Sequence, residues 1–264
     1  MDFLRVSRQK NIFSEFLYIL LNVAFVAVLF FLMYVSGQVY LALILVLLSK
    51  WRILAVRMRY WRANILANLV DISVGFGVVG LMYLANSAED SVVVWLQLVI
   101  SILYAVWLTA IKPLSSKKAM LVQSLIGLFV GTWSVMALSY MIPLPIVVIL
   151  LFIVGYGVAR HVLTVHEETQ LSLLSMVFGF MLAEIGWVMY HWTIGYGLVN
   201  FGDLKIPQAA IFMTLGGLAV ERMYAAITLK KSVKSAEYLA PAIFSIVTIL
   251  VLLVMFSSVG AGIV

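Results

Sequence analysis

Long apolar runs separated by short polar gaps occupy almost the whole chain of 264 residues. A helix needs about 20 residues, at about 1.5 Å each, to cross a hydrocarbon core of about 30 Å. Nine runs approach or reach this length, so the pattern predicts nine membrane-spanning helices in one integral membrane domain, residues 1–264, of the all-α class. The expected spans are residues 16–34, 38–58, 64–84, 92–111, 119–141, 146–165, 171–191, 208–228 and 239–258.

Three of these spans are imperfect. The second is apolar only over residues 39–48 and then meets Lys50, the sixth is apolar only over residues 146–159, and the eighth meets Glu221 and Arg222 well before its end. Proline is tolerated in the first turn of a helix and disrupts its interior, so proline positions give an independent guide to the boundaries. All five prolines lie near a predicted boundary: Pro113, Pro143, Pro145, Pro207 and Pro241.

The basic residues fall almost entirely in alternate gaps between the apolar runs. Lys205 is the single exception among seventeen Lys and Arg residues. The others are Arg5, Arg8, Lys10, Lys50, Arg52, Arg57, Arg59, Arg62, Lys112, Lys117, Lys118, Arg160, Arg222, Lys230, Lys231 and Lys234. Because positive residues that flank membrane spans stay in the cytoplasm, we expect a multi-pass protein of the plasma (inner) membrane with a cytoplasmic N-terminus and a C-terminus outside.

The composition separates this chain from soluble proteins. It is 65% hydrophobic and 11% charged, whereas soluble domains carry about 25% charged residues. The net charge of +6 reflects the topology signal and an attraction to anionic lipids at the cytoplasmic face. The expected partners are therefore the lipid bilayer, its anionic lipids and other membrane proteins, and not nucleic acid.

The sequence offers no motif for a cofactor, a metal site or a catalytic centre. The chain has no Cys, which excludes disulfides and thiolate ligands. His161 and His166 are five residues apart. They cannot share a helix face as the i, i+4 pair of a zinc site does. We therefore predict no metal, no cofactor and no catalytic residue.

Charged residues at membrane depth are the first candidates for a functional site, because they are costly there. Asp71, Arg160, Glu221 and Arg222 have similar predicted depths in the cytoplasmic half of the bilayer. Opposite charges at one depth offset each other's desolvation. The sequence therefore indicates a charged cluster, which either orients the helices or lines a binding or transport site, without showing which residues pair.

A polar stripe leads to this cluster along the third expected span. Asn64, Asn68, Asp71 and Gly75 are spaced i, i+4, i+7 and i+11, which places them on one face of a continuous helix. Such a stripe indicates either a water-filled vestibule open to the cytoplasm or hydrogen bonds between helices.

Glu184 is a more isolated carboxylate, predicted in the outer half of the seventh span. Trp187 and His191 share its helix face and lead toward the exterior. A carboxylate and a histidine along one face could relay protons. The alternative is a protonated Glu184 that makes ordinary hydrogen bonds.

Two further patterns lie at the membrane boundary or within one span. Cations alternate with aromatic residues between the second and third spans, a pattern that favours contact with anionic headgroups or simply fixes the topology. The lipid-headgroup candidates are Arg52, Arg57, Arg59 and Arg62. In the fifth span, Gly127 and Gly131 with Ser124 and Ser134 form a stripe of small residues, which predicts close helix packing inside the protein.

The segment Thr193–Gly197 is similar to the Thr-Val/Ile-Gly-Tyr-Gly selectivity filter of potassium channels, in which backbone carbonyls replace the hydration shell of the ion. Leu198 and Trp192 depart from that pattern, and the preceding helix has the length of a full span rather than a short pore helix. The chain is therefore not predicted to form a potassium pore.

These patterns favour a transporter or permease-like protein for a small solute, an ion or a lipid. Glu184, His191, Asp71, Asn68, Asn64, Arg160, Glu221 and Arg222 are the candidate lining residues. One alternative is a membrane-embedded enzyme for an anionic lipid, with Arg57, Arg59 and Arg62 holding phosphate and Asp71 as acid or base. Another is a non-catalytic subunit of a membrane complex.

Overall fold

A computed structural model describes residues 12–192, 194–197, 200–228 and 236–255, and it is helical apart from one two-residue strand pair. The prediction of an all-α bundle is confirmed at this level. The elements in chain order are α1 (Ile12–Ser36), α2 (Val39–Ser49), α3 (Trp51–Leu54), η1 (Met58–Tyr60), α4 (Trp61–Ala67), α5 (Leu69–Ala85), α6 (Asp90–Val106), η2 (Trp107–Ile111), α7 (Lys117–Ala137), α8 (Leu144–Val165), α9 (Leu171–Tyr190), β1 (Gly195–Tyr196), β2 (Ile206–Pro207), α10 (Gln208–Thr228) and α11 (Ala236–Met255).

Six helices in the described part of the chain are long and apolar enough to cross a membrane. They are α1, α6 with η2, α7, α8, α9 and α10. The segment from η1 to α5 is a seventh span if its two parts, bent by 64°, are taken together, and α2 and α11 contribute shorter apolar helices. The architecture is thus compatible with a multi-pass membrane protein, and nine complete spans remain a prediction.

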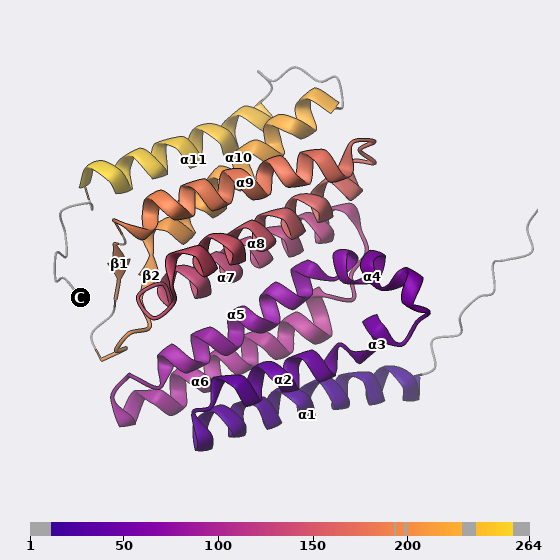
Figure 1. Cartoon of the computed structure of the whole chain (residues 1–264), viewed down its shortest axis with the longest axis vertical. Coiled ribbons are helices and arrows are strands. Elements are labelled where there is room, and N and C mark those ends of the chain that lie inside the picture. Colours follow the sequence, from indigo (N-terminus) through magenta and orange to yellow (C-terminus); the bar gives the residue numbers. More distant parts are fainter. Residues whose placement is uncertain (1–11, 193, 198–199, 229–235, 256–264) are drawn as a thin grey trace, which may run out of the picture.

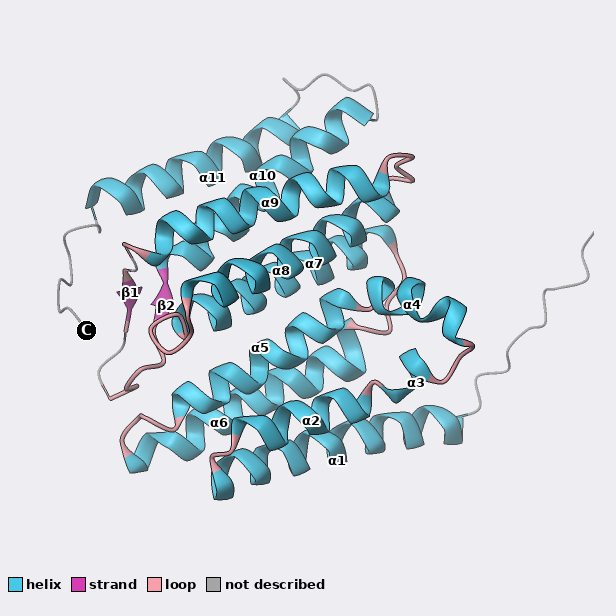
Figure 2. Cartoon of the chain, viewed as in Figure 1, coloured by secondary structure: helices cyan, strands magenta, loops and turns pink. Residues whose placement is uncertain are grey.

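Successive long helices run in opposite directions, so their connections alternate between the two ends of the bundle (Figure 1). The end that carries α3, α4 and the α8–α9 turn is called the basic end, because the described members of the alternate-gap cations lie toward it. The strand pair lies at the opposite end, and helices fill the space between (Figure 2).

The second and third expected spans differ most from the structure. Helix α2 ends at Ser49, because Lys50 leaves the helical conformation and its side chain turns toward Asp71. The third expected helix breaks at Asn68, whose amide Nδ2 donates to the Asn64 carbonyl at 2.8 Å. The continuous helix predicted from Asn64 to Gly75 is therefore wrong, since Asn64 lies on α4, bent by 64° from α5, and Asn68 lies at the junction.

Small residues allow the central helices to approach closely. A Cβ atom built on Gly127 would lie 2.6 Å from Val70 Cγ1, and one on Gly131 would lie 3.0 Å from Val154 Cγ1. These contacts join α7 to α5 and α8. The predicted internal packing role of the fifth span's small residues is confirmed.

The strand pair covers the end of the bundle opposite the basic end. Gly195 and Tyr196 pair antiparallel with Pro207 and Ile206, respectively. The Trp133 indole N–H donates to the Lys205 carbonyl at 2.8 Å and anchors this hairpin on α7. Within the filter-like motif, Gly195 and Tyr196 thus form a β-strand, while Thr193 and the following Leu198 lie outside the described residues.

Candidate functional site

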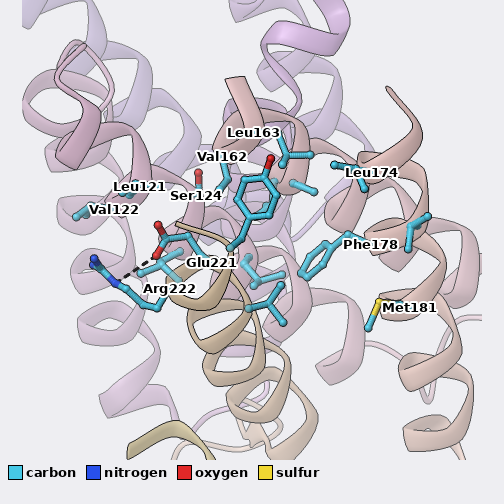
Figure 3. Close-up of a pocket in the computed structure, with 18 of the residues that line it drawn as sticks. Leu121, Val122, Ser124, Val162, Leu163, Leu174, Phe178, Met181, Glu221 and Arg222 are labelled. Carbon is cyan, nitrogen blue, oxygen red and sulfur yellow. Dashed lines mark ion pairs between the residues drawn. The ribbon is translucent and has the colours of Figure 1, made fainter. Parts of the chain in front are cut away.

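Four helices, α7, α8, α9 and α10, enclose a cavity of about 620 Å³ (Figure 3). Its walls are mainly aliphatic and aromatic, and its polar groups gather toward the basic end. The lining residues are Lys118, Leu121, Val122, Ser124, Leu125, Leu128, Val158, Ala159, Val162, Leu163, Leu174, Val177, Phe178, Met181, Gly217, Val220, Glu221, Arg222 and Tyr224.

The cavity exists because α9 and α10 pack against different helices. Helix α9 packs closely on α8, where a Cβ atom built on Gly155 would lie 3.1 Å from the Gly179 Cα atom, whereas α10 packs mainly on α7 and α11. Gly217 keeps the resulting space open. A Cβ atom there would lie 2.5 Å from Leu128 Cδ2 and 3.7 Å from Phe178 Cζ, and both residues line the cavity.

Charged groups form one end of this pocket. Glu221 is 9% exposed, and its Oε2 atom lies 3.2 Å from Arg222 Nε. Its other oxygen, Oε1, lies 3.5 Å from His166 Nε2. Three of these atoms are buried and make no hydrogen bond of good geometry: Glu221 Oε1, Arg222 Nε and His166 Nε2. The carboxylate is therefore paired by charge, while hydrogen-bonding capacity remains at the pocket's edge.

The α8–α9 turn holds this end of the pocket together. Glu167 has a positive φ of 57°, which lets the chain reverse between the two helices. The Tyr224 hydroxyl donates to Glu168, and the Gln170 backbone N–H donates to Glu168 Oε1 at 3.0 Å. That backbone N–H, followed by the Tyr224 hydroxyl, lowers the pKa of Glu168 below its usual value. Lys117 lies 3.7 Å from Glu167, so the turn contacts both α7 and α10.

A second group of charges surrounds Asp71, outside the pocket. Lys50 Nζ lies 2.5 Å and Lys112 Nζ 2.8 Å from Asp71 Oδ2, and the Trp107 indole N–H donates to Oδ1 at 3.2 Å. Trp107 begins the π-helical turn η2, and Lys112 follows its end. The wider turn thus lets two residues five apart reach one carboxylate.

The structure divides the predicted cluster of four charges. Glu221 pairs with Arg222, while Asp71 pairs with the two lysines. Arg160 lies 3.5 Å from the Tyr156 hydroxyl and does not line the pocket. The expectation of one cluster is corrected, because equal depth along the bundle does not place residues on facing sides of their helices.

Sequence reasoning missed Lys50 and Lys112 as partners because both were taken as topology signals. One feature of the sequence does distinguish Lys50 from the other topology signals: it interrupts an apolar run well before a full span is complete. Sequence reasoning also missed His166, whose contact with Glu221 depends on where the end of α8 lies relative to α10.

The side-chain amides of the two asparagines in the predicted stripe donate to backbone carbonyls. Asn64 Nδ2 donates to the Ile53 carbonyl at 3.3 Å, and Asn68 binds the Asn64 carbonyl. Trp61 adds indole hydrogen bonds to the carbonyls of Leu54 and Val56. These bonds fold the segment between α2 and α5 back on itself.

That segment displays the four lipid-headgroup candidates on its surface. Arg52, Arg57, Arg59 and Arg62 are all exposed, with Trp51, Met58 and Tyr60 exposed among them. The Arg59 guanidinium carbon lies 4.6 Å from the centre of the Tyr60 ring. Cations and apolar rings at one surface suit a membrane interface, and lipid contact here remains a prediction.

Glu184 and His191 lie on an exposed face of α9 and do not line the pocket. The rings of His191 and Trp187 meet edge to face, with centroids 5.5 Å apart. The two candidates thus share one surface, as their spacing predicts, but this surface faces away from the bundle interior.

Within the described ranges, no group of three or more His, Asp or Glu residues is arranged to hold a metal ion. Comparison of the chain with protein-family models, curated proteins and solved structures finds no match.

Proposed function

We propose that the protein binds a membrane amphiphile in the pocket between α7, α8, α9 and α10 and passes it between the bilayer and the basic end of the bundle. This is a permease-like role for a lipid or a lipid-like solute. The supporting observation is a cavity whose apolar walls end at Glu221 and Arg222. Sites for small molecules commonly enclose about 300–1,000 Å³ with mostly apolar walls and a few polar groups, and this pocket has both properties.

The arrangement of the pocket suits a molecule with two unlike ends. A hydrocarbon chain fits against Leu128, Phe178 and Met181, and a polar group fits near Arg222. Lipid tails are as apolar as a leucine-rich wall, so moving a chain from the bilayer into the pocket gains little free energy. Selectivity must therefore come from shape and from the polar end.

The covered opposite end supports access from the basic end or the side. The hairpin β1–β2 is fixed to α7 by Trp133, and the Asp203 backbone N–H donates to Ser87 Oγ at 2.7 Å. The enzyme alternative receives less support, because both carboxylate oxygens of Asp71 already have partners.

Lipid binding by protein reconstituted in nanodiscs tests the proposal, with native mass spectrometry to count retained lipids and a fluorescent lipid to measure displacement. Gly217→Leu directs a side chain into the pocket at Leu128 and Phe178, whereas Gly216→Leu makes the same change where nothing lies within 4 Å of the added Cβ atom. We expect Gly217→Leu to weaken retention at least about tenfold, which corresponds to about 1.4 kcal/mol, because the added side chain occupies space that the lipid chain would fill.

The Gly216→Leu variant is expected to retain lipid as the wild type does. Equal retention by both variants and the wild type, with all three folded, would contradict the proposal. Movement of the fluorescent lipid between leaflets of proteoliposomes then separates binding alone from passage.

A further inference from the structure

We infer that the pocket selects an amphiphile with an anionic oxygen headgroup, a phosphate or a carboxylate, bound by Arg222 together with Lys118. This inference rests on the proposed amphiphile site and names its ligand class. Both side chains line the charged end of the pocket, one on α10 and the other in the first turn of α7.

Arg222 has donors to spare for such a group. A guanidinium carries five N–H groups in a planar fork, and its ion pair with Glu221 runs through the Nε atom, 3.2 Å from Glu221 Oε2. The side chain is 34% exposed, and its terminal nitrogens point away from Glu221 (Figure 3). Two parallel N–H donors match the two oxygens of a carboxylate or phosphate better than a lysine does.

The charge balance at the pocket's edge favours an anion over a cation. Two lining residues, Lys118 and Arg222, are cationic, and one, Glu221, is anionic. Glu221 already lies between Arg222 and His166. A cationic headgroup would have to compete for that carboxylate, whereas an anion meets the remaining positive charge.

The direction of α7 adds to this preference. Ser116 caps its N-terminus by accepting the Ala119 backbone N–H at 3.2 Å, and Lys118 in the first turn lines the pocket. The partial positive charge of a helix N-terminus favours an anion within the first turn. An anionic group near Lys118 and Arg222 would leave its chain to extend toward Leu128 and Phe178.

Competition between lipids with identical chains tests the inference in the full-length protein in nanodiscs. The probes are a fluorescent phosphatidic acid and a fluorescent diacylglycerol, which has the same chains and no anionic oxygen, with inorganic phosphate as an anion without a chain. We expect the wild type to prefer the phosphatidic acid by about tenfold or more, the effect of a charge-assisted hydrogen bond, and inorganic phosphate to leave the lipid bound. Displacement by millimolar-range phosphate would instead show a site for the free oxyanion and would contradict a lipid as the source of the bound anionic group.

Three variants separate the headgroup inference from the pocket itself. Arg222→Gln and Lys118→Gln should each reduce the preference for the phosphatidic acid, while Arg160→Gln, a cation outside the pocket lining, should retain it. Lys118 is exposed, so we expect Lys118→Gln to fold, and this variant still tests the inference if Arg222→Gln fails to fold. An unchanged preference in a folded Arg222→Gln or Lys118→Gln variant, with lipid retention still lost in Gly217→Leu, would overturn the headgroup inference and leave the pocket standing.

Discussion

Lys50 Nζ lies 2.5 Å from Asp71 Oδ2, and both side chains are buried. Lys50 ends α2 and Asp71 lies in the first turn of α5, so this ion pair joins two helices across the folded segment between them. Lys112 contacts the same oxygen from the end of η2. One carboxylate therefore connects three parts of the N-terminal half of the bundle.

Asp71→Asn should strongly destabilise the protein. Removing one partner of a buried ion pair leaves the other charge unpaired and typically costs about 3–5 kcal/mol. The neutral amide would leave Lys50 and Lys112 with only each other's positive charge nearby. Chemical unfolding in detergent, followed by tryptophan fluorescence, measures the loss.

The matched comparison is Lys112→Gln, because the Lys112 side chain is 35% exposed and its ammonium can reach solvent. We expect a smaller loss for this variant than for Asp71→Asn. An Asp71→Asn variant as stable as the wild type would show that the carboxylate does not hold these helices together.

Gly77→Ala should disturb the contact between α5 and α7. A Cβ atom on Gly77 would lie 2.9 Å from the Val130 backbone oxygen, which cannot move without shifting α7. Overpacking of this kind costs about 1–3 kcal/mol. Gly216→Ala is the control, since its Cβ atom meets open space, and it should unfold at or above the wild-type denaturant concentration. The prediction fails if the two variants shift the midpoint equally.

Acid should weaken the hold of the α8–α9 turn on α10. The pKa of Glu168 is lowered in the folded protein, first by the Gln170 backbone N–H and next by the Tyr224 hydroxyl. The folded state therefore binds the proton less readily than the unfolded chain. The stabilisation is complete above the ordinary value of 4.5 and is lost as the pH falls through the lowered pKa.

Thermal unfolding of the wild type and Glu168→Gln across this pH range checks that sign. The wild type should be the more stable at neutral pH, and the difference should shrink as the pH falls below 4.5. A difference that stays constant or grows in acid would rule out the carboxylate as its source.

Glu184→Gln distinguishes the pocket from the path first indicated by the sequence. Glu184 is exposed on α9 and does not line the pocket, so this variant should retain lipid as well as the wild type in nanodiscs. Loss of lipid binding or movement in a folded Glu184→Gln protein would instead favour a route along the outer face of α9, with His191 as its neighbour.

Apolar run length was sufficient to predict the helical class, because each expected stretch contains a described helix. It could not predict where a charged or polar side chain ends or breaks a helix before the apolar run is complete. Helix α2 stops at Ser49 since Lys50 pairs with Asp71, and the break at Asn68 is supported by hydrogen bonds to Asn64. Such breaks depend on partners that are distant in the sequence or on local amide contacts, and hydropathy contains neither.

Two charged members of the candidate site were predictable, but Lys118, the contact with His166 and the shape of the pocket were not. Glu221 and Arg222 stood out because they interrupt an apolar span. The pocket itself depends on how α9 and α10 separate, and on the missing side chain of Gly217 between Leu128 and Phe178. Helix depth can be counted along a sequence, whereas the direction in which each residue faces follows only from packing.

Photocrosslinking tests the amphiphile pocket most directly. A phosphatidic acid with a diazirine in its chain is reconstituted with the protein, activated by light and mapped by mass spectrometry, with and without excess unlabelled phosphatidic acid. We expect crosslinks at Leu128 and Phe178 that the unlabelled lipid suppresses and that Gly217→Leu removes. Labelling confined to exposed residues such as Phe31 and Phe244, unaffected by competitor, would contradict a lipid site inside the bundle.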